Sequence, residues 1–177
     1  MTFRCKLALL CLLPIALTGC TSKSSPTQPH FLTGLNKYFE TRPDCLLNNV
    51  RFPYETSDRK EIAQMDTLVK SKLLEKTVEP AIHVSRYTVA AAGTRYAPRF
   101  CYGHRVANAI ESSTPLTVVN GFRQTHVTYR YTMQEVPVWA RSADVLKAFP
   151  EMAQRINGES TGTANLAQTA TGWQVPD

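Results

Sequence analysis

The sequence feature that most restricts the fold is a long alternation of polar and apolar residues in the second half of the chain. One face of this alternation carries Thr125, Val127, Tyr129, Tyr131 and Met133, and the other face carries polar side chains. Because successive side chains of a strand point to opposite faces, the pattern predicts a β-strand with one face on a core. Asn120-Gly121, which strongly favours a two-residue hairpin turn, precedes the strand, and Pro137 ends it.

Further strand and helix signals surround this stretch. Residues 98–105 alternate between aromatic and other side chains, which predicts a preceding strand. The tail from Gly162 to Val175 alternates as well and predicts a final hairpin that turns at Ala170-Thr171-Gly172. Between these parts, Ser142 and Pro150 have positions typical of helix starts, and two short helices are predicted there.

Helical spacing dominates the first half of the chain. Apolar residues between Ile62 and Val69 recur on one helical face, and Ser57 or Asp58 can cap that helix. A shorter helix is predicted over residues 31–39. Since helical signals come first and strand signals follow, we predict an α+β fold, with an N-terminal mainly helical part followed by an antiparallel β-rich part.

The first twenty residues have the pattern of an export signal. Arg4 and Lys6 precede an uncharged run from residue 7 to residue 17. Such a run is too short to cross a membrane as a helix, which takes about 20 apolar residues, and it has the usual length of a signal-peptide core. The run ends in Leu17-Thr18-Gly19-Cys20 and so resembles the lipobox of bacterial lipoproteins.

This resemblance implies that residues 1–19 are a signal peptide and that the Cys20 thiol carries lipid, with palmitate a usual component. Two or more acyl chains hold a protein firmly on a bilayer. A plain secretory signal with an incidental cysteine is the alternative. Aspartate after the cysteine often retains such proteins at the inner membrane, so Thr21 favours the periplasmic face of the outer membrane.

A polar segment separates the predicted anchor from the rest of the chain. Residues 20–30 are rich in serine, proline and other polar residues, which predicts a flexible tether behind the lipidated cysteine. The remaining residues 31–177 are expected to form a single α+β periplasmic domain, which could divide into sub-parts 31–97 and 98–177.

Loss of the signal peptide changes the charge and the cysteine count. The full chain has 20 basic and 14 acidic residues and a net charge of +6, which becomes +4 once two basic residues leave. Cys5 and Cys11 leave as well, and Cys20 becomes a thioether. Cys45 and Cys101 then remain as thiols, and a pair of thiols in an oxidising periplasm usually forms a disulfide. We expect that disulfide, and no nucleic-acid partner for a mildly basic anchored protein.

Residues 65–96 resemble the second half of a winged-helix module. The stretch 65–75 corresponds to the end of the family's helix, and 86–96 to its wing hairpin and closing step. Lys72 stands where the family usually has glycine, and Val89-Ala90 replaces its Leu-Thr pair. The resemblance implies a helix followed by a hairpin, and it makes nucleic-acid binding an alternative function.

Two short motifs could carry chemistry. Cys101 and His104 have the spacing of half a zinc site, which needs further ligands. Asp44-Cys45 resembles the Asp-Cys-Ser-Gly motif of cell-wall cysteine peptidases, but Leu46-Leu47 replaces the Ser-Gly pair. Both motifs use a thiol that the expected disulfide consumes. We predict no catalytic residue, metal ligand or cofactor, and we keep a cell-wall cysteine hydrolase using Cys45 and a histidine as an alternative.

Basic and aromatic residues alternate just before the long strand. They are Arg95, Tyr96, Arg99, Phe100, Tyr102 and Arg105. Such interleaving can bind anions, including single-stranded nucleic acid; we expect instead a strand that turns its aromatic rings inward and its arginines outward. One C-terminal core is expected from five further aromatic residues: Tyr129, Tyr131, Trp139, Phe149 and Trp173.

These features together predict a membrane-anchored lipoprotein of the bacterial cell envelope. The lipid on Cys20 would hold it on the membrane, and the lack of a coherent set of catalytic motifs favours a non-enzymatic binding or structural accessory. Its expected partner is another envelope protein.

The expected disulfide gives a direct stability prediction. A bridge between positions 45 and 101 restricts the unfolded chain and should stabilise the fold by about 4 kcal/mol. We predict that a reducing agent lowers the melting temperature measured by calorimetry. Full reaction of the unreduced protein with a thiol probe at Cys45 and Cys101 would contradict the bridge.

Overall fold

The computed structural model describes residues 27–176, and the predicted signal peptide and Cys20 lie outside them. Over these residues the chain forms four α-helices and two antiparallel sheets, so the predicted α+β class is confirmed. The helices are α1 (Gln28–Glu40), α2 (Arg59–Lys70), α3 (Ala143–Ala148) and α4 (Pro150–Ile156). Two short 3₁₀ helices are η1 (Ala91–Gly93) and η2 (Val138–Arg141).

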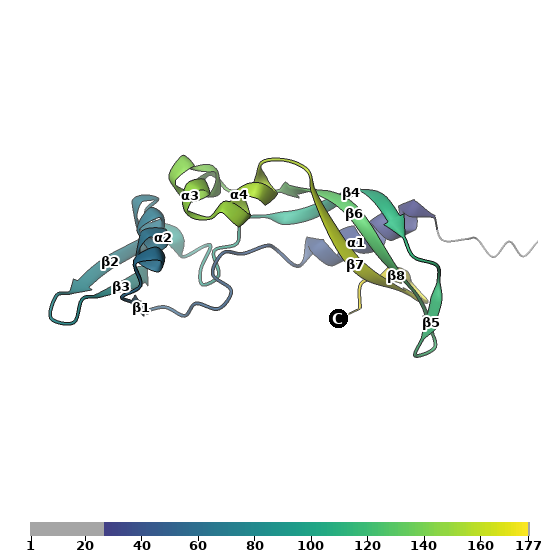
Figure 1. Cartoon of the computed structure of the whole chain (residues 1–177), viewed down its shortest axis with the longest axis horizontal. Helices are drawn as coiled ribbons and strands as arrows, with labels where there is room; N and C mark the ends of the chain where they lie inside the picture. Colours follow the sequence, from purple (N-terminus) through teal and green to yellow (C-terminus); the bar gives the residue numbers. More distant parts are fainter. Residues whose placement is uncertain (1–26, 177) are drawn as a thin grey trace, which may run out of the picture.

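The two sheets lie at opposite ends of an elongated molecule (Figure 1). The small sheet has the order β1-β3-β2, with strands β1 (Tyr54–Thr56), β2 (Leu74–Glu79) and β3 (Val84–Val89). The large sheet has the order β4-β6-β7-β8, and β5 pairs with β6 beside it. Its strands are β4 (His104–Ser113), β5 (Thr117–Val119), β6 (Phe122–Gln134), β7 (Ser160–Thr169) and β8 (Gly172–Gln174).

The long alternation in the sequence forms β6, as predicted. Its buried residues all lie on one face: Thr125, Val127, Tyr129 and Tyr131. Asn120 and Gly121 have φ values of 51° and 81°, as a tight hairpin turn requires, and they join β5 to β6. The predicted final hairpin is also present as β7 and β8.

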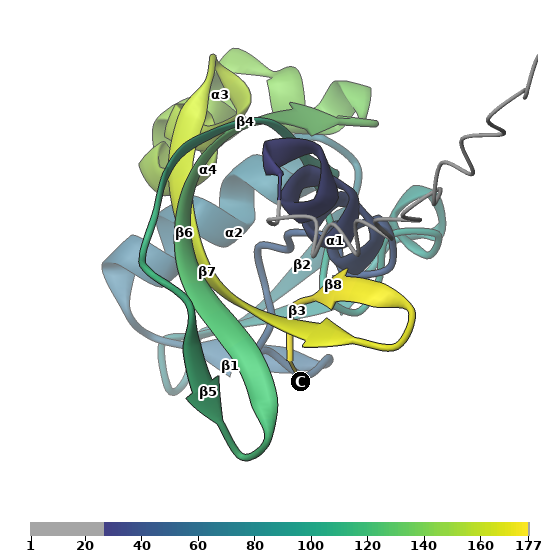
Figure 2. The same cartoon turned by 90° about the vertical axis from the view of Figure 1, so that its right-hand side faces the viewer.

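Helix α1 lies inside the curve of the large sheet (Figure 2). The residues that it buries there are Phe31, Gly34, Leu35 and Phe39. The ring of Phe31 stands edge-on to Trp173 of β8, with 5.0 Å between the ring centroids. The helix begins at Gln28, so residues 28–30 form its first turn and not the end of the tether. Proline suits that turn because its φ is already helical.

Local capping explains where α2 begins. The carboxylate of Asp58 accepts the backbone N–H groups of Lys60 and Glu61, both at 2.9 Å. Glu61 in turn accepts the hydroxyls of Tyr54 and Thr56, both at 2.6 Å, and these bonds hold the pKa of Glu61 below its usual value. The small sheet is therefore tied to the first turn of the helix.

The buried aromatic residues divide between two cores, so the expectation of one C-terminal core was wrong. The helical core, around α2, α3, α4 and the small sheet, contains Trp139 and Phe149. The sheet core, between α1 and the large sheet, contains Tyr129, Tyr131 and Trp173. The chain returns to the helical core because β6 ends near Pro137 and continues into η2 and α3. Both cores take residues from either side of position 97.

The predicted strand over residues 98–105 is a loop over most of its length. The strand β4 begins only at His104, and Phe100 has a positive φ of 53°. Phe100 and Tyr102 are nevertheless buried. The alternation reflects two aromatic side chains that anchor a loop in the helical core, and not the pleat of a strand.

We predict that Gly34→Ala destabilises the protein. An added Cβ would overlap the carbonyl oxygen of Trp173 and lie 2.9 Å from its carbonyl carbon, so α1 would have to move off β8. Alanine favours a helix over glycine by about 1 kcal/mol, but overpacking costs more, and we expect a net loss of about 1–2 kcal/mol in urea unfolding.

The control for this substitution is Gly158→Ala. Nothing lies within 4 Å of a Cβ at Gly158, so its effect should stay within about 0.5 kcal/mol. Equal stability of the two variants would contradict the close packing of α1 on β8.

Candidate functional site

Two loops, residues 44–47 and 99–103, lie side by side between the two cores. The amide of Tyr102 donates to the carbonyl of Asp44, and the amide of Asp44 donates back to the second loop, both at 2.8 Å. The predicted disulfide between Cys45 and Cys101 is confirmed and links them covalently. We call them the disulfide-linked loops.

The carboxylate of Asp44 binds two arginines from distant parts of the chain. Only 12% of its side chain is exposed. Arg105 of β4 donates from Nε to Oδ2 and from Nη2 to Oδ1, both at 2.8 Å. Arg155 of α4 donates from Nη1 to Oδ1 at 3.0 Å and contacts the hydroxyl of Tyr102 at 3.3 Å. A single carboxylate therefore joins a loop, a strand and a helix.

Aromatic rings surround the guanidinium of Arg105. It lies 5.4 Å from the ring centre of Phe39 and 5.0 Å from that of Tyr131. The hydrogen bonds to Asp44 raise the pKa of Arg105 above its ordinary value. Burial raises the pKa of Tyr129, although Arg105 opposes this shift. At neutral pH the site therefore holds a permanent positive charge beside a protonated hydroxyl.

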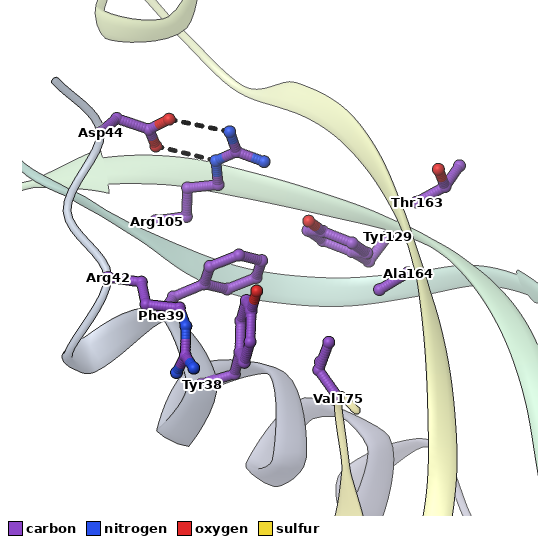
Figure 3. Close-up of a pocket in the computed structure, with 9 residues that line it drawn as sticks. All are labelled: Tyr38, Phe39, Arg42, Asp44, Arg105, Tyr129, Thr163, Ala164 and Val175. Carbon is purple, nitrogen blue, oxygen red and sulfur yellow. Dashed lines mark hydrogen bonds and ion pairs between the residues drawn. The ribbon is translucent and has the colours of Figure 1, made fainter. Parts of the chain in front are cut away.

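A pocket of about 350 Å³ opens beside this ion pair, between α1 and the strands β6 and β7 (Figure 3). Its lining residues are Tyr38, Phe39, Arg42, Asp44, Arg105, Tyr129, Thr163, Ala164 and Val175. The hydroxyl ends of Tyr38 and Tyr129 point toward the space next to Arg105, and Ala164 and Val175 form an apolar wall (Figure 3).

The lack of a side chain at Gly162 leaves space for the ring of Tyr129, which lines the pocket. Gly162 pairs with Tyr129 across β6 and β7, and a Cβ at this glycine would lie 2.7 Å from the Tyr129 hydroxyl oxygen. Glycine is needed because the tyrosine ring lies across β7 at this point. The strand pairing and this missing side chain together direct the hydroxyl into the pocket.

Charged side chains lie along one side of the pocket. Asp44 contributes one negative charge, and it contacts the positive charges of both Arg105 and Arg155. Arg42 adds a further arginine to the lining and lies 4.2 Å from the ring centre of Tyr38. The guanidinium of Arg105 and the hydroxyl donors suit an anionic group, and the apolar wall suits a short hydrocarbon portion next to it.

A larger pocket of about 530 Å³ lies on the other side of Arg155. The first disulfide-linked loop, α2 and α4 line it, and Glu61 and Glu151 place two carboxylates there. Lys60 and Arg155 also line it, but the two carboxylates disfavour an anion there, so we regard the smaller pocket as the candidate site.

The disulfide changes the meaning of the predicted chemical motifs. Cys45 and Cys101 are bonded to each other, so neither supplies the free thiol that a cysteine hydrolase or a zinc site needs. His104 instead lies 3.4 Å from the carboxylate of Glu135. In the part of the chain that the structure describes, no group of three or more His, Cys, Asp or Glu side chains could hold a metal ion.

The basic and aromatic segment is only partly as expected. Arg95 and Arg99 are exposed, and Phe100 and Tyr102 are buried, as predicted. The expectation was wrong for Arg105, which turns inward to Asp44. The sequence reasoning missed Tyr38 and Arg155. No local pattern indicates that Arg155 reaches the carboxylate of Asp44, or that Tyr38 lines the pocket beside it.

Neither a family model, nor a curated protein, nor a solved structure matches this chain. Among residues 27–176, no helix is long and apolar enough to cross a bilayer.

We predict that Asp44→Ala lowers the free energy of unfolding by about 3 kcal/mol. The value is at the lower end for breaking a buried ion pair, because both arginines keep some contact with water. The matched control is Glu55→Ala, which removes an exposed pair with Arg86 at 3.5 Å and should cost less than about 1 kcal/mol. Denaturant unfolding measures both, and a similar small loss in each would show that Asp44 does not hold the cores together.

Proposed function

We propose that this chain is a membrane-anchored lipoprotein of the bacterial cell envelope and acts as a non-enzymatic binding accessory. The lipobox-like sequence ending in Cys20 supports the anchor. The observation that carries the binding role is the partly buried, permanently charged Arg105 beside a pocket with hydroxyl and apolar walls. In this proposal the pocket holds an anionic group of an envelope partner.

The geometry favours a carboxylate or a phosphate group as the bound anion. Asp44 occupies one edge of the Arg105 guanidinium, and the nitrogen on the other edge faces Tyr129 (Figure 3). A guanidinium has five N–H donors, so this second edge can bind another oxyanion. Because Asp44 already fixes the arginine, little side-chain freedom is lost on binding.

A second candidate, nucleic-acid binding, rests on the proposed likeness to a winged-helix module. The helix α2 is followed by the hairpin of β2 and β3, which is the order that the likeness implies. However, Lys76 pairs with Asp66 at 2.8 Å, and Lys70 lies 3.8 Å from Asp144. These pairs reduce the positive charge beside α2, so we rank this function second. Binding to DNA that weakens steeply with salt would favour it.

Mass spectrometry of the protein purified from its native membrane tests the anchor. We expect removal of the first 19 residues and a mass increase on Cys20 that matches attached acyl chains. Cys20→Ser should abolish that increase and release the protein from the membrane fraction. An unmodified Cys20 in native protein would contradict the anchor and leave the pocket untested, so crosslinking in the envelope should follow to identify the partner.

We predict that small anions bind the pocket and that the Tyr129 hydroxyl contributes. The chain is titrated with N-acetylalanine, which presents a carboxylate, and with methyl phosphate, and chemical shifts give the dissociation constants. Tyr129→Phe should weaken binding of the preferred probe about tenfold, because it removes one hydrogen bond to a charged group.

Tyr96→Phe is the control for this measurement. It removes a tyrosine hydroxyl outside the pocket and should leave the affinity unchanged. Absence of binding by both probes, or equal effects of the two variants, would refute the pocket as an anion site.

A further inference from the structure

The tip of the β5–β6 hairpin presents large apolar side chains to solvent. Val118 is 71% exposed and Phe122 is 51% exposed, and Val119 between them is also exposed. Isolated apolar residues are common on protein surfaces, but here the tip is apolar on both faces. Val119 and Phe122 are cross-strand partners on one face, and Val118 lies on the other face opposite Arg123. They do not belong to either core.

The hairpin holds these side chains in a defined arrangement. Its two strands pair from Thr117 with Gln124 to Val119 with Phe122, and the Asn120-Gly121 turn closes the tip. A two-residue turn with both φ angles positive matches the twist of the strands, so the tip is short and regular. The apolar residues therefore project as a small, pre-formed wedge.

The surroundings of the wedge lack acidic side chains, and Arg123 lies beside the tip. No acidic residue occurs between Ser112 and Gln134. Arg130, farther along β6, pairs with Glu111 and Glu159 and adds no net charge here. The neighbouring strands β7 and β8, with the turn between them, also lack acidic residues. Arg123 directly follows Phe122 and donates to Gln168 of β7 at 3.3 Å. An apolar tip with an arginine beside it and no acidic side chain nearby suits the headgroup region of an anionic bilayer.

The position of the hairpin fits the same surface. The β5–β6 hairpin and the N-terminal end of α1 lie at one end of the molecule, and both face the viewer in Figure 2. Only eight peptide units separate Cys20 from Gln28, which span at most about 28 Å when fully extended. An anchor at Cys20 would therefore keep this end, and not the β2–β3 end, close to the lipid.

We propose that the β5–β6 hairpin inserts Val118, Val119 and Phe122 into the headgroup region of the membrane to which the chain is tethered. The insertion is a second contact that fixes the orientation of the molecule on the bilayer. It rests on the proposed anchor, because the short link to Cys20 is what keeps this end of the molecule close to the lipid. The lipid surface is the occupant favoured by that link, by Arg123 and by the lack of acidic residues near the tip.

Fluorescence quenching in vesicles tests this insertion without native lipidation. The chain from Cys20 onward is coupled through the Cys20 thiol to a maleimide phospholipid in phosphatidylethanolamine–phosphatidylglycerol vesicles, while the other two thiols stay in their disulfide. Tryptophan is placed at the tip by Phe122→Trp. Brominated phospholipids should quench its emission several-fold more than that of the unsubstituted chain, whose Trp139 and Trp173 are buried.

The matched control is Ile82→Trp, near the tip of the β2–β3 hairpin at the opposite end of the molecule. Ile82 is as exposed as the residues of the wedge, at 65%, so exposure alone predicts equal quenching. Equal quenching of the two reporters, or none at position 122, would overturn the proposal. Because the tether is chemical, either result leaves the tests of native lipidation and anion binding unaffected.

A second pair of variants separates insertion from contact with another copy of the chain. Val118→Ser combined with Phe122→Ser should lower the affinity of the uncoupled chain for the same vesicles at least about tenfold, whereas Val78→Ser with Ile82→Ser should not. If the uncoupled chain instead dimerises in ultracentrifugation without lipid, and the tip variant alone abolishes the dimer, the tip is a protein interface and the proposal fails.

Discussion

The carboxylate of Asp44 is the interaction on which the arrangement of this molecule depends. A partly buried carboxylate is costly unless its oxygens accept hydrogen bonds, and here three N–H donors from two arginines supply them. Arg105 lies near the start of β4 in the large sheet, and Arg155 lies on α4. The next residue after the aspartate is covalently bonded to the second loop. Charge pairing and a covalent bond therefore meet at one place between two apolar cores.

This junction also explains why the candidate site lies where it does. Apolar burial has little directional preference, so two cores in contact could pack at many angles. The paired bonds from Arg105 to Asp44 have a fixed geometry and select one of them. The same bonds hold the guanidinium over Phe39, with its other edge toward the hydroxyl of Tyr129. The pocket is a consequence of how the two cores are joined.

Local chemistry was predictable from the sequence, and distant contacts were not. Asn120-Gly121, the cap at Asp58 and the alternation in β6 act within a few residues, so their patterns were sufficient. Residues 98–105 alternate for another reason, because two buried rings anchor a loop there. Arg155 reaches Asp44 across 111 positions, and no periodicity reports such a contact. The pair Asp44-Cys45 did draw attention to the correct region, although through a peptidase likeness that the disulfide does not support.

The packing of α1 against β8 has a consequence for how the chain is assembled. Helix α1 packs against a strand that is synthesised much later than the helix itself, and the ring of Phe31 meets Trp173 there. A polypeptide that emerges N-terminus first can therefore cover α1 with β4 at an earlier stage, but it leaves the part of α1 around Phe31 exposed until β8 has appeared. Any product that stops short of Trp173 keeps this part of the helix exposed, where proteases and chaperones can recognise it.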